Sequence, residues 1–174
     1  GGLMGVAIAI LIYSRKYQVP FLGLTDFVTP LVPAGLLFGR LGNFIGQELY
    51  GRPTDVSWAM VFPADPEQLA RHPSQLYEAA LEGLVLFLII NWFARKPRLY
   101  GHVTGLFLIL YGVFRFAVEF VRQPDAQFVG QSALVESFSW MTRGQTLCIP
   151  MIILGLWFTR KSVQRLLGKS VSSS

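Results

Sequence analysis

Leu24–Ile45 reads LTDFVTPLVPAGLLFGRLGNFI, an apolar stretch long enough to cross a bilayer. It is interrupted by prolines and glycines, namely Pro30, Pro33, Gly35, Gly39 and Gly42. Non-helical backbone at membrane depth is tolerated only where it is buried in protein or lines a cavity. We therefore expect a broken helix that ends in Gly39–Asn43, beside a cavity open to the outer leaflet. Close helix packing through small residues is the alternative explanation of the glycines.

The rest of the chain has the composition of a membrane protein. Hydrophobic residues make up 52% of its 174 residues and charged residues only 14%, whereas about a quarter of the residues in soluble domains are charged. Further apolar segments are Gly1–Tyr13, Gln75–Phe93, Val103–Val121 and Gln145–Thr159. The sequence predicts an all-α fold, a polytopic transmembrane helical bundle with a broken helix and periplasmic loops. Residues 1–169 would form this single domain, and the Ser-rich tail 170–174 would be disordered.

Basic residues predict the orientation of these segments. Nine of the 15 Lys and Arg residues lie in clusters that follow the first, third and fifth segments, at Arg15–Lys16, Arg95–Arg98 and Arg160–Lys169. If the chain crosses at every segment, all these clusters fall on one side, which the positive-inside bias assigns to the cytoplasm. The net charge of +5 therefore does not indicate a nucleic-acid partner. The first segment is too short for a bilayer core of ~30 Å, so we expect a chain that lacks an N-terminal part.

Ionisable residues in the fourth segment are the first candidates for chemistry. Charged side chains inside a membrane cost about 2.5–3.5 kcal/mol or more, and they usually face the interior of a bundle. Tyr111, Arg115 and Glu119 recur at every fourth position and share one helix face. A structural salt bridge between Arg115 and Glu119 is the alternative. Arg40 would place a second guanidinium group at a similar depth, and two such groups suit an anionic lipid head group.

The segment Gln47–Ser74 is expected to form an outer loop whose end carries His72. His72 can act as a base near neutral pH and is a catalytic candidate, although a single loop histidine is more often solvated or capping. Ser74 is expected to cap the next helix, and Glu82 to face the interior. Cys148 is interpreted as a small buried side chain rather than a nucleophile. The histidines and the cysteine have no metal-ligand spacing, so neither a metal nor a cofactor is predicted.

Three motifs resemble those of the prolipoprotein diacylglyceryl transferase family. They are GRLGNFIGQELYGR at Gly39–Arg52, HPSQLYE at His72–Glu78 and YGVFRFAVEFVRQPD at Tyr111–Asp125, and the opening Gly1-Gly2 resembles the end of a His-Gly-Gly element. The motifs stand in the family's order and span nearly the whole chain. In the family's pattern the essential histidine would fall just before Gly1. Gly46 stands where the family commonly has Asn.

The resemblance implies a reaction and a set of site residues. A diacylglyceryl group would move from phosphatidylglycerol to the lipobox cysteine thiol in the signal peptide of a preprolipoprotein, at the bacterial inner membrane. A thioether would form and glycerol phosphate would leave. The positions implied to bind the lipid are Arg40, Asn43, Glu48 and Gly51, with Arg40 on the phosphate. Arg115 would stabilise the leaving phosphate, with Tyr111 and Glu119 positioning it.

Two other functions are compatible with the same residues. A lipid-binding or transport protein would use the arginines to hold an anionic head group without turnover. A purely structural membrane subunit would need them for stability and not for chemistry. The transferase interpretation depends on Arg40 and Arg115 meeting in the outer half of the bilayer.

Overall fold

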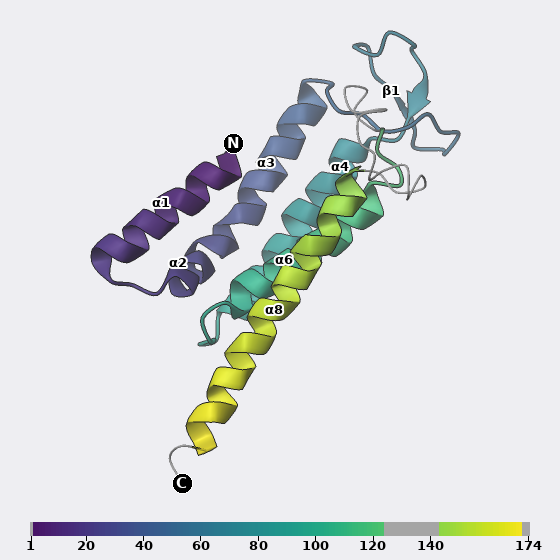
Figure 1. The fold of residues 1–174 in the computed structure, drawn as a ribbon. Helices are drawn as coiled ribbons and strands as arrows, with labels where there is room; N and C mark the ends of the chain where they lie inside the picture. Colours follow the sequence, from purple (N-terminus) through teal and green to yellow (C-terminus); the bar gives the residue numbers. More distant parts are fainter. Residues whose placement is uncertain (1, 124–142, 172–174) are drawn as a thin grey trace.

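The computed structural model describes residues 2–123 and 143–171, and most of them are helical. The α-helices are α1 (Gly2–Tyr17), α2 (Phe21–Val28), α3 (Val32–Ile45), α4 (Ser74–Glu78), α5 (Leu86–Ala94), α6 (His102–Val118) and α8 (Arg143–Val171). Figure 1 shows the chain passing up and down through them in alternation. Each predicted apolar segment corresponds to helix, and α8 is longer than predicted, at 29 residues. Residues 172–174 of the predicted disordered tail lie outside the described ranges.

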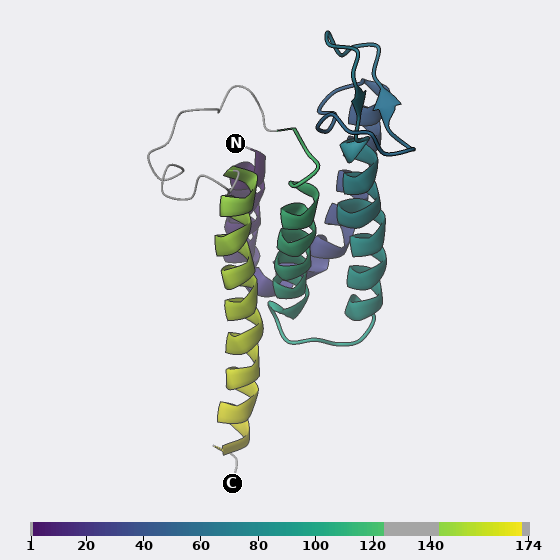
Figure 2. The same cartoon turned by 90° about the vertical axis from the view of Figure 1, so that its right-hand side faces the viewer.

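Two helical stretches among the described residues are long and apolar enough to cross a membrane. They are Phe21–Ile45, with 25 residues, and Ser74–Ala94, with 21. Helix α6 is apolar but shorter. The end of α1, the connection between α5 and α6, and the lower half of α8 lie at one end of the molecule (Figures 1 and 2). The chain segments with the basic clusters are therefore gathered at that end, as the predicted alternation requires.

The second segment is interrupted at Pro30, the first of the prolines and glycines that predict a broken helix. A short 3₁₀ helix, η1 (Thr29–Leu31), joins α2 to α3, and Pro30 and Pro33 stand in the first positions of η1 and α3. Proline is tolerated there because the first N–H groups of a helix have no helical partner. Helix α3 ends at Ile45, two residues beyond the end predicted at Gly39–Asn43.

Glycines other than the predicted ones bring helices close together. A Cβ on Gly83 would lie 2.8 Å from Leu37, and one on Gly112 would lie 2.6 Å from Ile152. Gly105 of α6 and Gly155 of α8 also face each other's carbonyl groups at close range. A Cβ on Gly35, Gly39 or Gly42 would meet nothing within 4 Å in the described part of the chain. The packing alternative is therefore not seen at those three positions.

The helix from Ser74 to Ala94 contains a π-helical stretch that the sequence does not predict. This stretch, η2 (Ala79–Val85), has wider turns than the α-helical parts α4 and α5 on either side. Single π turns are rare and frequently lie at functional sites. Beyond η2, the buried side chains of Leu86, Ile90 and Val103 form the core between α5 and α6. Cys148 is also buried, at 1% exposure, as predicted.

The connection between α3 and α4 adds a small sheet to the predicted all-α fold. Strands β1 (Met60–Val61) and β2 (Ala70–Arg71) pair antiparallel, and they are too short for a side-chain alternation to be visible in the sequence. This connection lies at the end of the molecule opposite the basic clusters (Figure 1). The predicted helix cap at Ser74 is wrong, because its hydroxyl donates to the Leu49 carbonyl at 3.1 Å instead. That bond fastens the connection to the start of α4.

At the basic end, Asp26 of α2 holds the start of α6. Its carboxylate accepts bonds from the Gly101 and Thr104 backbone N–H groups at 2.7 and 2.8 Å, and from the Thr104 hydroxyl at 2.6 Å. A carboxylate satisfies the free N–H groups of a helix N-terminus and interacts well with its dipole. Asp26 therefore ties the second and fourth predicted segments together at the end opposite Arg40 and Arg115.

Candidate active site

Arg40 and Arg115 meet at one buried carboxylate, that of Glu78. The three residues come from α3, α6 and the last position of α4. Arg40 Nε lies 2.9 Å from Glu78 Oε2, and Arg115 Nη1 donates a hydrogen bond of 2.6 Å to Glu78 Oε1. Two guanidinium groups from separate helices therefore converge, as the sequence predicts. Their approach needs an anion between them, because like charges at such a distance repel.

Glu82, in η2, is a second buried carboxylate beside the same two arginines. Its Oε2 lies 3.8 Å from Arg40 Nη2, and its Oε1 lies 3.7 Å from Arg115 Nη1. Neither oxygen has a hydrogen-bond partner in the described part of the chain, although the side chain is fully buried. A buried carboxylate without hydrogen bonds is costly, so its ionised form depends on the two nearby guanidinium groups. The interior-facing position predicted for Glu82 is confirmed.

Glu119 and Arg122 extend this cluster at the end of α6. Glu119 Oε2 lies 3.1 Å from Arg115 Nη2 and 3.9 Å from Arg122 Nη1. Arg122 Nε in turn lies 3.7 Å from Glu78 Oε1. The salt bridge considered as the structural alternative for Arg115 is therefore present, as one part of a larger network. We call these three arginines and three glutamates the arginine cluster: Arg40, Arg115, Arg122, Glu78, Glu82 and Glu119.

The first turn of α8 packs directly on the Glu119 carboxylate. A Cβ on Gly144 would lie 2.6 Å from the Glu119 carboxyl carbon, so only glycine allows this approach. The N-terminus of a helix carries a partial positive charge that favours a nearby carboxylate. Glu119 therefore connects the arginine cluster to α8 as well as to Arg115.

Other residues predicted to bind or position the lipid lie outside the cluster's ion-pair network. The Tyr111 ring stacks on Phe107, with centroids 5.7 Å apart, and packs against the core between α5 and α6. The Asn43 carbonyl accepts a 2.9 Å bond from the Glu48 backbone N–H. The Glu48 side chain is exposed and, within residues 2–123, forms no ion pair with the cluster. The roles of Tyr111, Asn43 and Glu48 stay predictions.

His72 and Gly51 belong to the connection between α3 and α4. The His72 Nδ1 atom lies 3.3 Å from the Tyr77 hydroxyl, which accepts a 2.7 Å bond from Trp58 Nε1. Gly51 N–H donates to the His72 carbonyl at 2.9 Å. A Cβ on Gly51 would lie 2.6 Å from that carbonyl oxygen and 2.7 Å from the Val121 oxygen, so the site requires glycine. Gly51 thus holds the connection against the end of α6, and the role of His72 stays a prediction.

A second buried ion pair, Asp65–Arg71, stabilises this connection. Arg71 donates to both Asp65 oxygens, at 2.6 and 3.2 Å, and to Gln123 Oε1 at 2.6 Å. It also pairs with Glu67, and its guanidinium lies over the Tyr50 ring. The hydrogen bonds from Arg71 lower the pKa of Asp65 to about 2, from a usual value of 3.8. Burial and the nearby Asp65 carboxylate raise the pKa of Tyr50.

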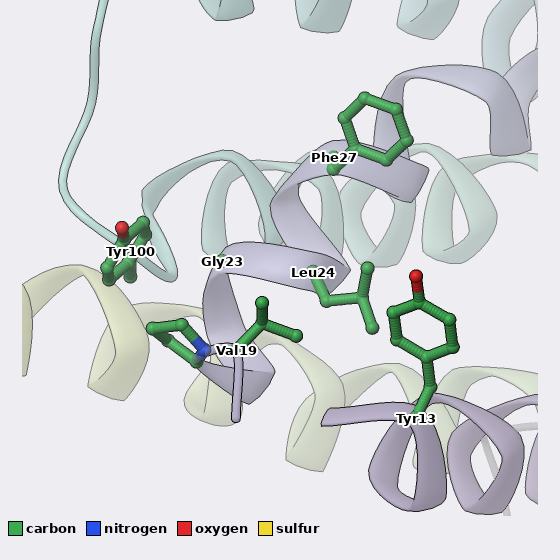
Figure 3. A pocket seen from close by; sticks show the side chains of 7 residues that line it. Tyr13, Val19, Gly23, Leu24, Phe27 and Tyr100 are labelled. Carbon is green, nitrogen blue, oxygen red and sulfur yellow. The ribbon is translucent and has the colours of Figure 1, made fainter. Parts of the chain in front are cut away.

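An apolar hollow lies at the opposite end of the helices, where α1 turns into α2. Figure 3 shows its lining, which includes Tyr13, Leu24, Phe27 and Tyr100. The hollow has a volume of about 340 Å³ and is widely open. It contains no residue of the arginine cluster and no charged side chain, so it lacks the chemistry needed to hold a phosphate.

Residues 1–160 match the sequence profile of a family described as prolipoprotein diacylglyceryl transferase. The chain belongs to the prolipoprotein diacylglyceryl transferase family. Three similar proteins carry the name phosphatidylglycerol–prolipoprotein diacylglyceryl transferase. The protein from Teredinibacter turnerae is 63% identical over 155 residues, which cover 89% of this chain and 52% of the relative. The proteins from Pseudomonas putida and Marinomonas sp. are 58% and 56% identical over 158 and 155 residues, covering 90% and 89% of this chain and 57% and 56% of their own.

This member of the family spans about half the length of the relatives it matches. The arginine cluster lies wholly within that half and within the matched residues. Glu78 and Arg122 are site residues that the sequence does not predict. A signal for Glu78 was present, because Glu78 and Glu82 are spaced by four in an apolar segment, as Arg115 and Glu119 are.

Proposed function

We propose that this protein transfers the diacylglyceryl group of phosphatidylglycerol to the lipobox cysteine of preprolipoproteins. The observation that carries the proposal is the convergence of Arg40 and Arg115, whose side chains keep 18% and 12% of their surface exposed. Guanidinium groups are suited to bidentate binding of phosphate, and partial exposure leaves an edge of each open to a ligand. The names of the relatives, which mention phosphatidylglycerol and a prolipoprotein, support the same assignment.

In the proposed reaction the cysteine sulfur, as a thiolate, forms a bond to the glyceryl carbon next to the phosphate. The bond between that carbon and its phosphate oxygen breaks, and the electron pair leaves on the oxygen. The products are a diacylglyceryl thioether and glycerol phosphate, and the thiol proton passes to a base. The sulfur is the only nucleophile required, and negative charge collects on the departing phosphate. That charge is what the site must stabilise.

The residues divide this work between binding and charge stabilisation. Arg40 binds the phosphate of the lipid, with Asn43 and Glu48 at the adjoining end of α3 and Gly51 in the connection that follows. Arg115 stabilises the leaving phosphate, and Tyr111 and Glu119 position Arg115 from the same helix. His72 is a further catalytic candidate in the connection. The leaving oxygen carries more negative charge in the transition state than in the bound lipid, so these roles stabilise the transition state more than the bound lipid.

The same arrangement supports a polytopic protein of the bacterial inner membrane with its site toward the periplasm. The segments with the basic clusters lie at one end of the helices, which would be cytoplasmic by the positive-inside bias. The connection between α3 and α4 lies at the other end, together with the C-terminal part of α6 that carries Arg115. A lipid from the outer leaflet would then reach the cluster with its head group first.

The test of the proposal is turnover by the full-length protein. Phosphatidylglycerol and a lipobox peptide are supplied, and the peptide is followed by mass spectrometry. We expect a mass gain of one diacylglyceryl group on the cysteine and release of glycerol phosphate. The same peptide with its Cys replaced by Ser should stay unmodified. A wild-type protein that is folded and gives no mass gain would overturn the proposal.

A lipid-binding protein without transferase activity is the second candidate, favoured by the same pair of arginines. It would bind phosphatidylglycerol and leave the peptide unmodified. A structural role alone predicts instead that Arg40→Ala and Arg115→Ala lower the melting temperature and leave the activity of the folded fraction intact. Turnover and melting of the same variants therefore separate all three functions.

A further inference from the structure

We propose that Glu78 is a positioning residue, which holds Arg40 and Arg115 so that both face one phosphate. This inference rests on the proposed transferase function and names a residue that the motif assignments leave without a role. Glu78 is fully buried, and each of its two oxygens meets a different arginine, at 2.9 Å for Arg40 and 2.6 Å for Arg115. A single carboxylate therefore fixes the separation of two cations from different helices.

The atoms used by Glu78 decide which atoms stay available for a ligand. Glu78 engages Arg40 through Nε and Arg115 through Nη1, while Glu119 engages Arg115 through Nη2. Within the described residues, the Nη atoms of Arg40 have no hydrogen bond, and Nη2 lies 3.8 Å from the Glu82 carboxylate. A phosphate oxygen can accept from those Nη donors without displacing Glu78. The ion pair with Glu78 thus orients Arg40 and leaves its Nη donors available for a ligand.

Glu82 provides the matched comparison, because it has the same charge, the same burial and the same two arginines. Its oxygens stay at 3.7 and 3.8 Å and form no hydrogen bond with described residues. Glu78 also has one oxygen, Oε2, without a hydrogen bond in the described residues, but that oxygen lies 2.9 Å from Arg40 Nε, and Glu78 Oε1 accepts a hydrogen bond from Arg115. Glu82 lies beyond hydrogen-bond distance of both arginines, so it contributes charge but little orientation. The two glutamates therefore separate orientation from charge within one site.

The expected consequence of Glu78→Gln is a loss in turnover without a loss in lipid binding. The change removes one negative charge from the cluster, so an anionic lipid should bind as tightly as before or more tightly. The arginines lose the carboxylate that aligned them, so the stabilisation of the leaving phosphate falls. We expect kcat to fall by about tenfold or more, with KM for phosphatidylglycerol unchanged or lower. Glu82→Gln should lower kcat by about threefold or less, since it removes charge alone.

The experiment measures kcat and KM for phosphatidylglycerol, its dissociation constant and the melting temperature in the full-length wild type, E78Q, E78D and E82Q. A fall in kcat for E78Q with retained affinity supports the proposal, whereas unchanged kcat, or an affinity weaker by about tenfold, overturns it. If E78Q does not fold, E78D decides, because Asp keeps the charge and is too short to reach both arginines. E78D with wild-type kcat would overturn the proposal.

The failure of this inference can be told apart from failure of the transferase assignment. Wild-type turnover with an unaffected E78Q variant rejects only the role of Glu78. A wild type that binds phosphatidylglycerol without modifying the peptide rejects the transferase, and the affinity of E78Q then decides the role of Glu78. Retained or tighter binding in E78Q supports the orienting role in that case, and binding weaker by about tenfold contradicts it.

Discussion

Two buried groups of arginine and carboxylate lie in this molecule, and they differ in how completely they are satisfied. In the connection between α3 and α4, Arg71 donates to Asp65 twice and to Gln123 once, and it also pairs with Glu67. In the arginine cluster, by contrast, both oxygens of Glu82 lack a hydrogen bond among the described residues. Every nitrogen of the Arg71 guanidinium already donates a hydrogen bond, whereas the arginine cluster has polar atoms that no described residue satisfies, beside partly exposed arginines.

The exposure of the arginines also separates a structural ion pair from a candidate site. Arg71 is 2% exposed, while Arg40 and Arg115 keep 18% and 12% of their side chains exposed. Buried charges without complete hydrogen bonding are costly, so they persist where a function requires them. We therefore interpret the Asp65–Arg71 pair as a structural ion pair and the arginine cluster as the candidate site.

The largest expected effect is the loss of turnover in Arg40→Ala and in Arg115→Ala. Each removes a guanidinium group from the proposed phosphate site, and the activity should fall by about 10²–10³-fold or more. Arg115→Lys should also be poor, because an ammonium cannot reproduce the guanidinium fork. Mass spectrometry of a lipobox peptide measures the effect. Arg98→Ala, at the basic end of the molecule, is the control and should keep wild-type activity; full activity in either cluster variant would refute their roles.

Arg71→Met should have the next largest effect, and it should act on stability. Removing Arg71 leaves the Asp65 carboxylate without the guanidinium that pairs with it, which destabilises the folded connection. We expect a lower melting temperature and proteolysis within the connection between α3 and α4. Glu67→Gln is the matched control, because Glu67 is 64% exposed and exposed pairs contribute about 0–1 kcal/mol. Equal losses in the two variants would contradict the structural role of the Asp65–Arg71 pair.

Gly51→Ala should cause a smaller loss, which affects both the stability of the connection and the activity of the arginine cluster. The added Cβ would clash with the His72 and Val121 carbonyl oxygens and push the connection away from the end of α6. Overpacking of this kind costs about 1–3 kcal/mol. Melting and turnover should therefore decline together. Gly35→Ala serves as the control, since a Cβ there meets nothing within 4 Å in the described residues. An unchanged melting temperature for Gly51→Ala would be inconsistent with the close approach.

The smallest expected effect is an acid-dependent loss of stability in the connection. Arg71 lowers the pKa of Asp65 to about 2 in the folded protein, from 3.8. The folded state therefore binds its proton later than the unfolded state does, so this contribution is present above about pH 4 and is lost as the pH falls toward 2. Unfolding measured between pH 5 and pH 2 should show it. Asp65→Asn should remove that part of the pH dependence, and an identical slope in the variant would argue against it.

Three features can be predicted from the sequence alone: the helical segments, their alternating directions, and the two arginines that converge. The length of an apolar segment and the position of its flanking basic residues are set by the membrane and the water around it. This constraint acts on each segment separately and can therefore be seen in the local sequence. The face shared by Arg115 and Glu119 follows from helix geometry alone, and the structure shows their salt bridge. Glu82 was placed inside for the same reason.

Two features are visible only in the folded protein: the carboxylate that the two arginines share and the π-helical stretch. The contact of Arg40 with Glu78 joins positions that are far apart in sequence, so no local pattern encodes it. The π-helical stretch and the small sheet likewise depend on packing against α3 and on the connection's own ion pair. The 3₁₀ turn η1, by contrast, lies where Pro30 predicted an interruption.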